Sequence, residues 1–182
     1  MRRLIAPLSL LMLGGIAIAG ALGIAPSDAA STDVRVQVAR MVSGIVGYAR
    51  WPVQAEAYRF CSAGEAVHLR NPQESLAHVV DRPISARLLA LHDGASDLAA
   101  CDILYFGSMP STQRSRLLAL TAGRPILTIT EDDALCEDAT MFCLAIRGSD
   151  VRLLANLDAI ARSGIRIDPK VLQLLQRRLV QP

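Results

Sequence analysis

The sequence lacks an excess of either charge, and this narrows the range of possible partners. Its 19 Lys and Arg residues nearly balance its 17 Asp and Glu residues, so the net charge is only +2 at pH 7. Binding to nucleic acid or to an anionic membrane surface depends on a clear surplus of positive charge. We therefore expect neither nucleic acid nor a lipid surface among the partners of this protein.

The sequence also lacks the motifs that mark common enzyme classes. It contains no GxxxxGK[ST] phosphate loop, no GxSxG nucleophile turn, no HExxH zinc motif and no CxxC redox motif. The three histidines, His68, His78 and His92, have no metal-ligand spacing with the cysteines. We therefore predict no enzymatic activity, no catalytic residue, no cofactor and no metal site.

The first 29 residues are predicted to be an export signal. Arg2 and Arg3 precede an apolar stretch, and Ser27-Asp28-Ala29 supplies the small residues that signal peptidase prefers. A membrane anchor is the alternative, although Pro7 and several glycines dilute the stretch. Cleavage after Ala29 would leave residues 30–182 as a single exported domain, with no later run approaching the roughly 18 apolar residues that cross a bilayer.

Four cysteines, Cys61, Cys101, Cys136 and Cys143, lie in that exported domain. An even number of exported cysteines usually means disulfide bonds, and four cysteines allow three pairings. We favour Cys136–Cys143, which are seven residues apart, together with Cys61–Cys101, which both lie in strand-like segments. The alternative that one pair stays reduced as small buried side chains remains open. A thiol oxidoreductase is a weaker hypothesis because the spacing lacks CxxC.

Apolar runs alternate with helical patterns along the domain. We expect helices over 34–50, 65–80 (interrupted at Pro72) and 111–122, and strands over 57–63, 83–88, 101–107 and 125–130. Two further strands, 141–147 and 151–157, form a hairpin, followed by a short helix ending near Gly164 and a last helix from Asp168. This order predicts an α/β fold, with a mostly parallel sheet covered by helices on both faces and a late antiparallel hairpin.

Acidic residues follow one of these strands, at Glu131-Asp132-Asp133. Carboxylates at the carboxyl end of a parallel strand can hold a metal or a phosphoryl group. Solvated loop acids are the preferred interpretation here, because the cluster borders the loop that leads to Cys136.

The hairpin is the predicted place for partner binding. Alternation puts Val151, Leu153, Ala155 and Leu157 on one apolar face, and Leu154 is apolar on the opposite face. Phe142 is expected to point away from Cys143, and Ile160 starts the next helical face. An exposed patch of Phe142, Leu154 and Ile160 would be a docking site. The alternative that all three belong to the core stays open.

Several segments, taken in order, resemble the YfiR family of periplasmic repressors of a membrane-bound diguanylate cyclase. They are Met41–Val46, Tyr48-Ala49-Arg50-Trp51-Pro52, Cys101–Gly107, Met141-Phe142-Cys143, Asn156–Ala159, Ala161–Gly164 and Val171-Leu172. No single motif is specific, whereas their order and spacing span nearly all of the exported domain.

The resemblance implies a regulatory, non-enzymatic protein of the periplasm. It implies binding to the periplasmic domain of a YfiN-type diguanylate cyclase, which lowers cyclic di-GMP, and sequestration by a YfiB-type outer-membrane lipoprotein. It also implies a homodimer and two disulfides among Cys61, Cys101, Cys136 and Cys143. A periplasmic small-ligand sensor is the alternative function, and a deep pocket lined by Trp51 and polar groups would favour it.

Overall fold

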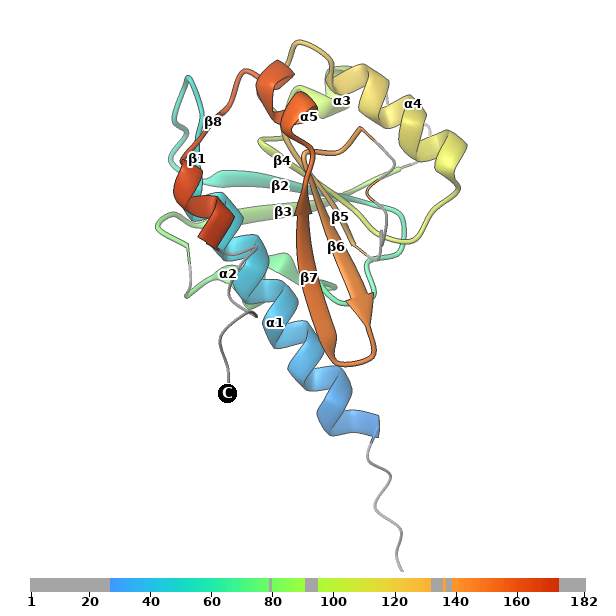
Figure 1. Cartoon of the computed structure of the whole chain (residues 1–182). Coiled ribbons are helices and arrows are strands. Elements are labelled where there is room, and N and C mark those ends of the chain that lie inside the picture. Colours follow the sequence, from blue (N-terminus) through green and yellow to red (C-terminus); the bar gives the residue numbers. More distant parts are fainter. Residues whose placement is uncertain (1–26, 79, 91–94, 132–135, 137–138, 174–182) are drawn as a thin grey trace, which may run out of the picture.

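A computed structural model of the chain describes residues 27–78, 80–90, 95–131, 136 and 139–173. Its helices are α1 (Ser27–Tyr48), α2 (Pro72–Leu76), α3 (Ala95–Leu98), α4 (Ser111–Thr121), α5 (Leu157–Arg162) and the 3-10 helix η1 (Pro169–Val171). Its strands are β1 (Ala49–Arg50), β2 (Tyr58–Ala63), β3 (Ile84–Leu89), β4 (Ile103–Phe106), β5 (Leu127–Glu131), β6 (Phe142–Arg147), β7 (Asp150–Ala155) and β8 (Arg166–Ile167). Figure 1 shows the helices packed around a central sheet.

The central sheet has six strands in the order β3-β2-β4-β5-β6-β7. The first five strands run parallel to their neighbours, and β7 is antiparallel to β6. A second, two-stranded sheet pairs β1 with β8 in antiparallel fashion. The predicted α/β class, the mostly parallel sheet and the late antiparallel hairpin are therefore confirmed.

Alternation along the strands divides the core into two clusters. In β4, Ile103 and Tyr105 join a first cluster that includes residues of α1 and α2, whereas Leu104 and Phe106 join a second cluster. The second cluster contains Leu98 of α3 and Leu117 of α4. All four β4 side chains are buried, which is why this segment is apolar throughout. Helices covering both faces along the full width of the sheet stay a prediction.

Helix α1 supplies one long stripe of the first cluster. Val34, Val38, Val42, Ile45 and Val46 recur at helical spacing and are almost fully buried. The helix contacts β7 and η1, and its first turns extend beyond the tip of the β6–β7 hairpin in Figure 1. No helix among the described residues has both the length and the hydropathy needed to cross a membrane.

Two predicted helices differ from the structure. Among the described residues of the segment 65–80, only Pro72–Leu76 is helical. The backbone before it bonds elsewhere: Glu65 pairs with Ser108, and the N–H groups of Val67 and His68 donate to Glu131. The last helix starts as predicted after Asp168, as the 3-10 turn Pro169–Val171. Its expected continuation through Leu174 and Leu175 lies outside the described residues.

Candidate functional site

The first disulfide joins Cys61 of β2 to Cys101, just before β4, across a Cα–Cα distance of 5.8 Å. Strands β2 and β4 are adjacent and parallel, with Phe60 opposite Ile103. This register brings Cys61 close enough for a bridge to Cys101, which lies two positions before the first residue of β4. Both cysteines are buried in the second core cluster.

The second disulfide joins Cys136 to Cys143 of β6, with a Cα–Cα distance of 5.5 Å. Cys136 has a positive φ of 52°, in the left-handed region, and is half-buried, whereas Cys143 is fully buried. The Thr140 hydroxyl lies 3.1 Å from the Cys143 sulfur. This bridge ties the segment before β6 to the hairpin that was predicted to bind a partner.

Of the three residues predicted to form a docking patch, Phe142 is enclosed, whereas Leu154 and Ile160 are each partly exposed. Phe142 has none of its side chain exposed and belongs to the first core cluster, so the expectation that it is exposed is wrong. Leu154 stands opposite Cys143 in the hairpin register and is half-buried. Ile160 is half-buried and packs against the first cluster.

The physical reason is strand alternation. Phe142 does point away from Cys143, but that direction leads into the first cluster, because Phe142 pairs with Ala155 and lies between β5 and β7. Leu157, expected on the apolar face of the second hairpin strand, is instead the first residue of α5 and is 68% exposed. Leu154, Leu157 and Ile160 are therefore among the apolar side chains of this region that reach the surface.

Two motifs that are far apart in the sequence meet at the amino ends of the parallel strands. The Asp102 carboxylate accepts hydrogen bonds from Arg59 N at 2.9 Å, Nε at 3.0 Å and Nη2 at 2.5 Å. The bond to Asp102 raises the pKa of Arg59. The Asp102 carbonyl oxygen accepts from Trp51 Nε1 at 3.2 Å and from Leu127 N at 2.8 Å. Asp102 therefore organises this end of the sheet.

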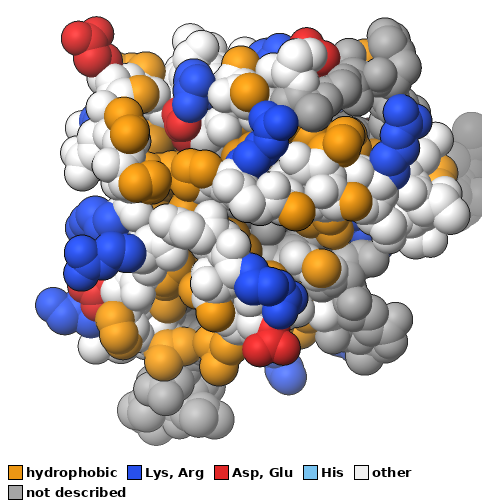
Figure 2. All heavy atoms as spheres, turned by 90° about the horizontal axis from the view of Figure 1, so that it is seen from above, with side chains coloured by type: hydrophobic (Ala, Val, Ile, Leu, Met, Phe, Trp, Pro, Cys, Tyr) orange, Lys and Arg blue, Asp and Glu red, His pale blue; other side chains and the backbone are white. Residues whose placement is uncertain are grey.

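A hollow of about 490 Å³ opens beside the Arg59–Asp102 pair. Its walls include Trp51, Pro52, Cys101 and Arg124. Trp51 is only 7% exposed, and its ring centroid lies 5.3 Å from that of Tyr58. The indole therefore forms part of the wall and exposes little of its own surface. The surface in Figure 2, which views the molecule of Figure 1 from above, is hollowed and carries blue Lys and Arg side chains among hydrophobic groups.

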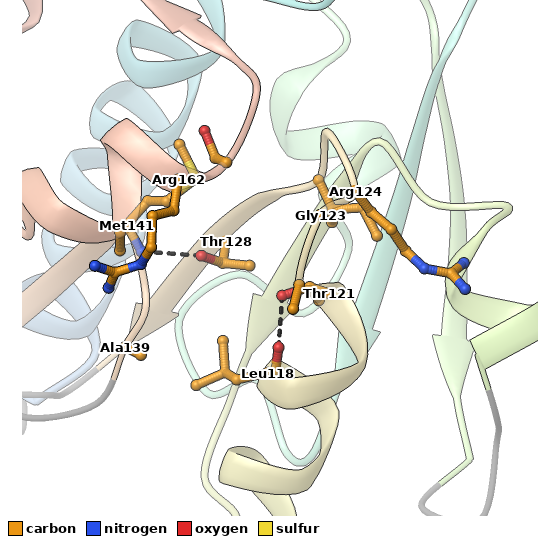
Figure 3. Close-up of a pocket in the computed structure, with 12 residues that line it drawn as sticks. Leu118, Thr121, Gly123, Arg124, Thr128, Ala139, Met141 and Arg162 are labelled. Carbon is orange, nitrogen blue, oxygen red and sulfur yellow. Dashed lines mark hydrogen bonds between the residues drawn. The ribbon is translucent and has the colours of Figure 1, made fainter.

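A second hollow, of about 430 Å³, lies between α4, β5 and α5 (Figure 3). Leu118, Thr128, Met141 and Arg162 contribute to its walls. The Thr128 hydroxyl accepts a hydrogen bond from Met141 N at 2.9 Å, and this bond holds the start of β6 against β5. In Figure 3, Arg162 lies along one wall and Arg124 points away from the centre.

At the opposite, carboxyl end of the strands, Glu131 is buried with 4% of its surface exposed. Its carboxylate accepts from the backbone N–H groups of Val67 and His68 and from the Tyr105 hydroxyl at 2.8 Å. Burial and the Glu131 charge raise the pKa of Tyr105 well above its ordinary value. Glu131 is therefore a structural acid, and its interpretation as a solvated loop acid is wrong. Asp132 and Asp133 lie outside the described residues.

Glycine is required where two segments meet near Glu131. A Cβ built on Gly107 would stand 2.3 Å from the backbone of Glu65. The segment after β2 and the end of β4 therefore touch through their main chains. His68 is half-buried beside this contact, His78 is exposed, and His92 lies outside the described residues. Within the described ranges, His, Cys, Asp and Glu form no group of three that could hold a metal ion.

A family model described as YfiR/HmsC-like matches residues 36–175. The chain belongs to the YfiR/HmsC-like family. The matched region contains the whole six-stranded sheet, both disulfides and both hollows of this YfiR/HmsC-like protein. The resemblance inferred from the order of its sequence motifs is thereby confirmed.

Sequence reasoning missed several residues that organise this YfiR/HmsC-like fold. The pairing of Arg59 with Asp102 had no local signal, because 43 positions separate the two residues. In the sequence, Glu131 could not be told apart from the acidic residues that follow it. Its burial becomes visible only in the structure, where Glu131 is the last residue of a fully buried strand.

Proposed function

We propose that this protein is a periplasmic regulator that binds the periplasmic domain of an inner-membrane diguanylate cyclase and represses it. The observation that carries the proposal is the family match over residues 36–175. Membership in the YfiR/HmsC-like family supports a regulatory role in cyclic di-GMP signalling rather than catalysis. Repression of the cyclase would lower cytoplasmic cyclic di-GMP.

The proposed contact surface is the end of the hairpin and the start of α5. Leu154 and Ile160 are half-buried and Leu157 is 68% exposed, so together they offer apolar area on either side of the β7–α5 corner. Asn156 fixes this corner, because its side chain accepts from Ala159 N at 2.9 Å and caps α5. A rigid corner loses little conformational freedom when a partner binds.

The proposal is tested by deleting the gene and measuring cyclic di-GMP. Deletion should raise the cyclic di-GMP level, and expression of the wild-type chain should bring the level back down. Complementation with Leu154→Glu or Leu157→Glu should fail while periplasmic protein levels are maintained, because Leu157 is 68% exposed and Leu154 is half-buried. Leu88→Glu is the matched control, because Leu88 is 73% exposed on β3 at the far edge of the sheet. Unchanged cyclic di-GMP in the deletion strain would refute repression of a cyclase.

Two assembly partners belong to the same proposal: a YfiB-type outer-membrane lipoprotein that sequesters the protein, and a second copy that forms a homodimer. Light scattering on the purified chain tests the dimer, and a mass of one chain at micromolar concentration would refute it. Affinity capture of the chain should retain the lipoprotein as well as the cyclase domain. The Leu154→Glu variant shows whether the two partners share a surface.

The export signal is also part of the proposal. Helix α1 begins at Ser27, and residues 1–26 lie outside the described structure. Cleavage after Ala29 would leave most of α1 intact, including its buried stripe from Val34 onward. Intact-mass analysis of protein released from the periplasm should give an N-terminus at Ala30. A retained full-length chain in the membrane fraction would instead indicate an anchor.

A small-ligand sensor is the second candidate, supported by the hollow of about 490 Å³ beside Trp51 and the Arg59–Asp102 pair. This volume lies in the range of about 300–1,000 Å³ that ligand sites occupy. Succinate and acetate are suitable probes because guanidinium groups border the hollow. Calorimetric titration should show binding that Arg124→Gln weakens, because Arg124 lines the hollow. No heat at millimolar probe would refute the site for small carboxylates.

A further inference from the structure

The hollow of about 430 Å³ between α4, β5 and α5 has an apolar floor. Leu118, Ile126 and Met141 line it, and these side chains are 8%, 4% and 2% exposed. The volume lies in the range of about 300–1,000 Å³ that is typical of small-ligand sites. A molecule that fills this hollow therefore covers apolar atoms that now face water.

The hydroxyl groups around this floor already have partners within the chain. Thr121 Oγ1 and Ser163 Oγ each donate to a carbonyl oxygen three positions earlier, at 2.7 Å and 2.8 Å. Thr128 Oγ1 accepts from Met141 N at 2.9 Å. Since these bonds use the hydroxyls for helix ends and strand pairing, a ligand gains little polar recognition from them.

Arg162 supplies a positive charge at the wall of the hollow. It lies exposed in the last turn of α5, and Figure 3 shows it on one side, with Leu118 and Thr121 on the other. Its guanidinium makes no hydrogen bond or ion pair with the part of the chain that the structure describes. Arg124 also lines the hollow, but its side chain points away from the centre.

The charges around the hollow favour an anion. Among the described residues that line it, none is an Asp or a Glu. The carboxyl ends of α4 and α5 meet here, and their carbonyl dipoles favour a cation, but more weakly than a full guanidinium charge favours an anion. A planar guanidinium also matches the two oxygens of a carboxylate.

We infer that this hollow binds a monocarboxylate with a medium-length apolar chain, whose carboxylate meets Arg162 and whose chain covers Leu118, Ile126 and Met141. The hollow adjoins the one beside Trp51 at Arg124 and Ile126, but its floor and its charge are its own. Binding is measured on the purified chain, so the inference does not depend on repression of a cyclase.

The ligand class is tested by calorimetric titration with decanoate, below the concentration at which it forms micelles. Decyltrimethylammonium, which has the same chain and the opposite charge, is the matched control and should bind about tenfold more weakly. Octanoate should bind about three- to tenfold more weakly than decanoate, because it buries fewer CH₂ groups. Equal affinity for the two head groups, or no heat with millimolar decanoate, would overturn the inference.

The role of Arg162 is tested by substitution. Arg162→Gln should weaken decanoate binding by about three- to tenfold, Arg162→Lys should retain most of the affinity, and high salt should reduce the difference. Arg116→Gln is the matched control, because Arg116 is exposed on α4 and does not line the hollow. An equal loss in Arg162→Gln and Arg116→Gln would contradict a carboxylate at Arg162.

The place of the chain is tested by filling the hollow. Ala122 is exposed and lines it, so Ala122→Trp should abolish decanoate binding. Ala119 is also exposed at the end of α4 but is not part of the lining, and Ala119→Trp should leave the affinity unchanged. Urea unfolding shows that both variants are folded. Undiminished binding by a folded Ala122→Trp variant would overturn the inference.

The bound position is also read directly, by methyl NMR of methionine in the unsubstituted protein. Beyond residue 29 the chain contains Met41, Met109 and Met141. Decanoate should shift the Met141 methyl signal and leave that of Met109, which lines a different hollow at the carboxyl end of the strands. A change in the fluorescence of Trp51 without a shift at Met141 would place decanoate in the neighbouring hollow and refute this site.

Discussion

The indole Nε1 of Trp51 donates a hydrogen bond to the carbonyl oxygen of Asp102 at 3.2 Å, across 51 positions of sequence. Each residue belongs to a separate motif of the family resemblance. Their contact closes the amino end of the parallel sheet, because the same carbonyl also accepts from Leu127 N at the start of β5. Trp51 thus secures the segment after α1 to the centre of the sheet.

Replacing Trp51 by Phe should cost about 1 kcal/mol beyond the loss of packing, because the Asp102 carbonyl loses a donor. Trp51→Ala should cost about 3–5 kcal/mol, since Trp51 is 93% buried against Tyr58 and the first cluster. Urea unfolding measures both values. If the two variants were equally stable, the ring would contribute no packing, contrary to its burial.

Glu131→Gln should destabilise the fold by about 1–3 kcal/mol. Each carboxylate oxygen accepts a backbone N–H, from Val67 or His68, and the amide of glutamine can replace only one of these acceptors. Chemical denaturation provides the measurement. Glu65→Gln, at an exposed acid in the same segment, is the control and should change stability by less than about 0.5 kcal/mol. Comparable losses in both variants would contradict a special role for Glu131.

Stability should fall at alkaline pH because of Tyr105. Burial and Glu131 raise the pKa of Tyr105 above its ordinary value of 10.0, so the folded state retains a proton that the unfolded state releases. The contribution of Tyr105 is therefore complete below about pH 10 and is lost as pH rises from there toward the raised pKa, at up to about 1.4 kcal/mol per pH unit. Urea midpoints between pH 9 and pH 11 measure the decline, which Tyr105→Phe should make shallower. Tyr58, whose pKa is raised chiefly by burial, adds a decline of the same sign.

Phe142→Ala should lower the free energy of unfolding by about 3–5 kcal/mol, because the whole side chain is buried between β5 and β7. Any loss of partner binding would then follow from the loss of folded protein. Val53→Ala, at a side chain that is 82% exposed, is the control. A melt of Phe142→Ala that matched the parent would contradict this burial.

Cys143→Ser should cost about 2–3 kcal/mol, as expected for opening a short loop between cysteines seven residues apart. Thermal melts under non-reducing conditions measure the loss. Cys136→Ser is the matched partner variant and should lose a similar amount. A large difference between the two would show that packing of the buried Cys143 side chain, rather than the bridge, accounts for the effect.

Local pattern predicted the parts of the fold that depend on local chemistry. The apolar segment at 101–107, the hairpin around Gly148 and the helix of 111–121 all follow from composition and spacing. The segment 65–80 failed the same reasoning, because its backbone donors bond to Glu131, a residue of β5 more than 60 positions away. A helical propensity cannot compete with such a tertiary acceptor once the strand is in place.

The sequence by itself determined the α/β class, the family and the six strands of the main sheet, because periodicity and motif order are local properties of the chain. Only the tertiary structure decided which apolar residues face solvent: Phe142 is enclosed by neighbouring strands, whereas Leu157 begins a surface helix. It also decided what stands beside each cysteine. Parallel pairing of β2 with β3 places Arg87 next to a bridge that closes 40 positions of chain, and no local pattern records that neighbour.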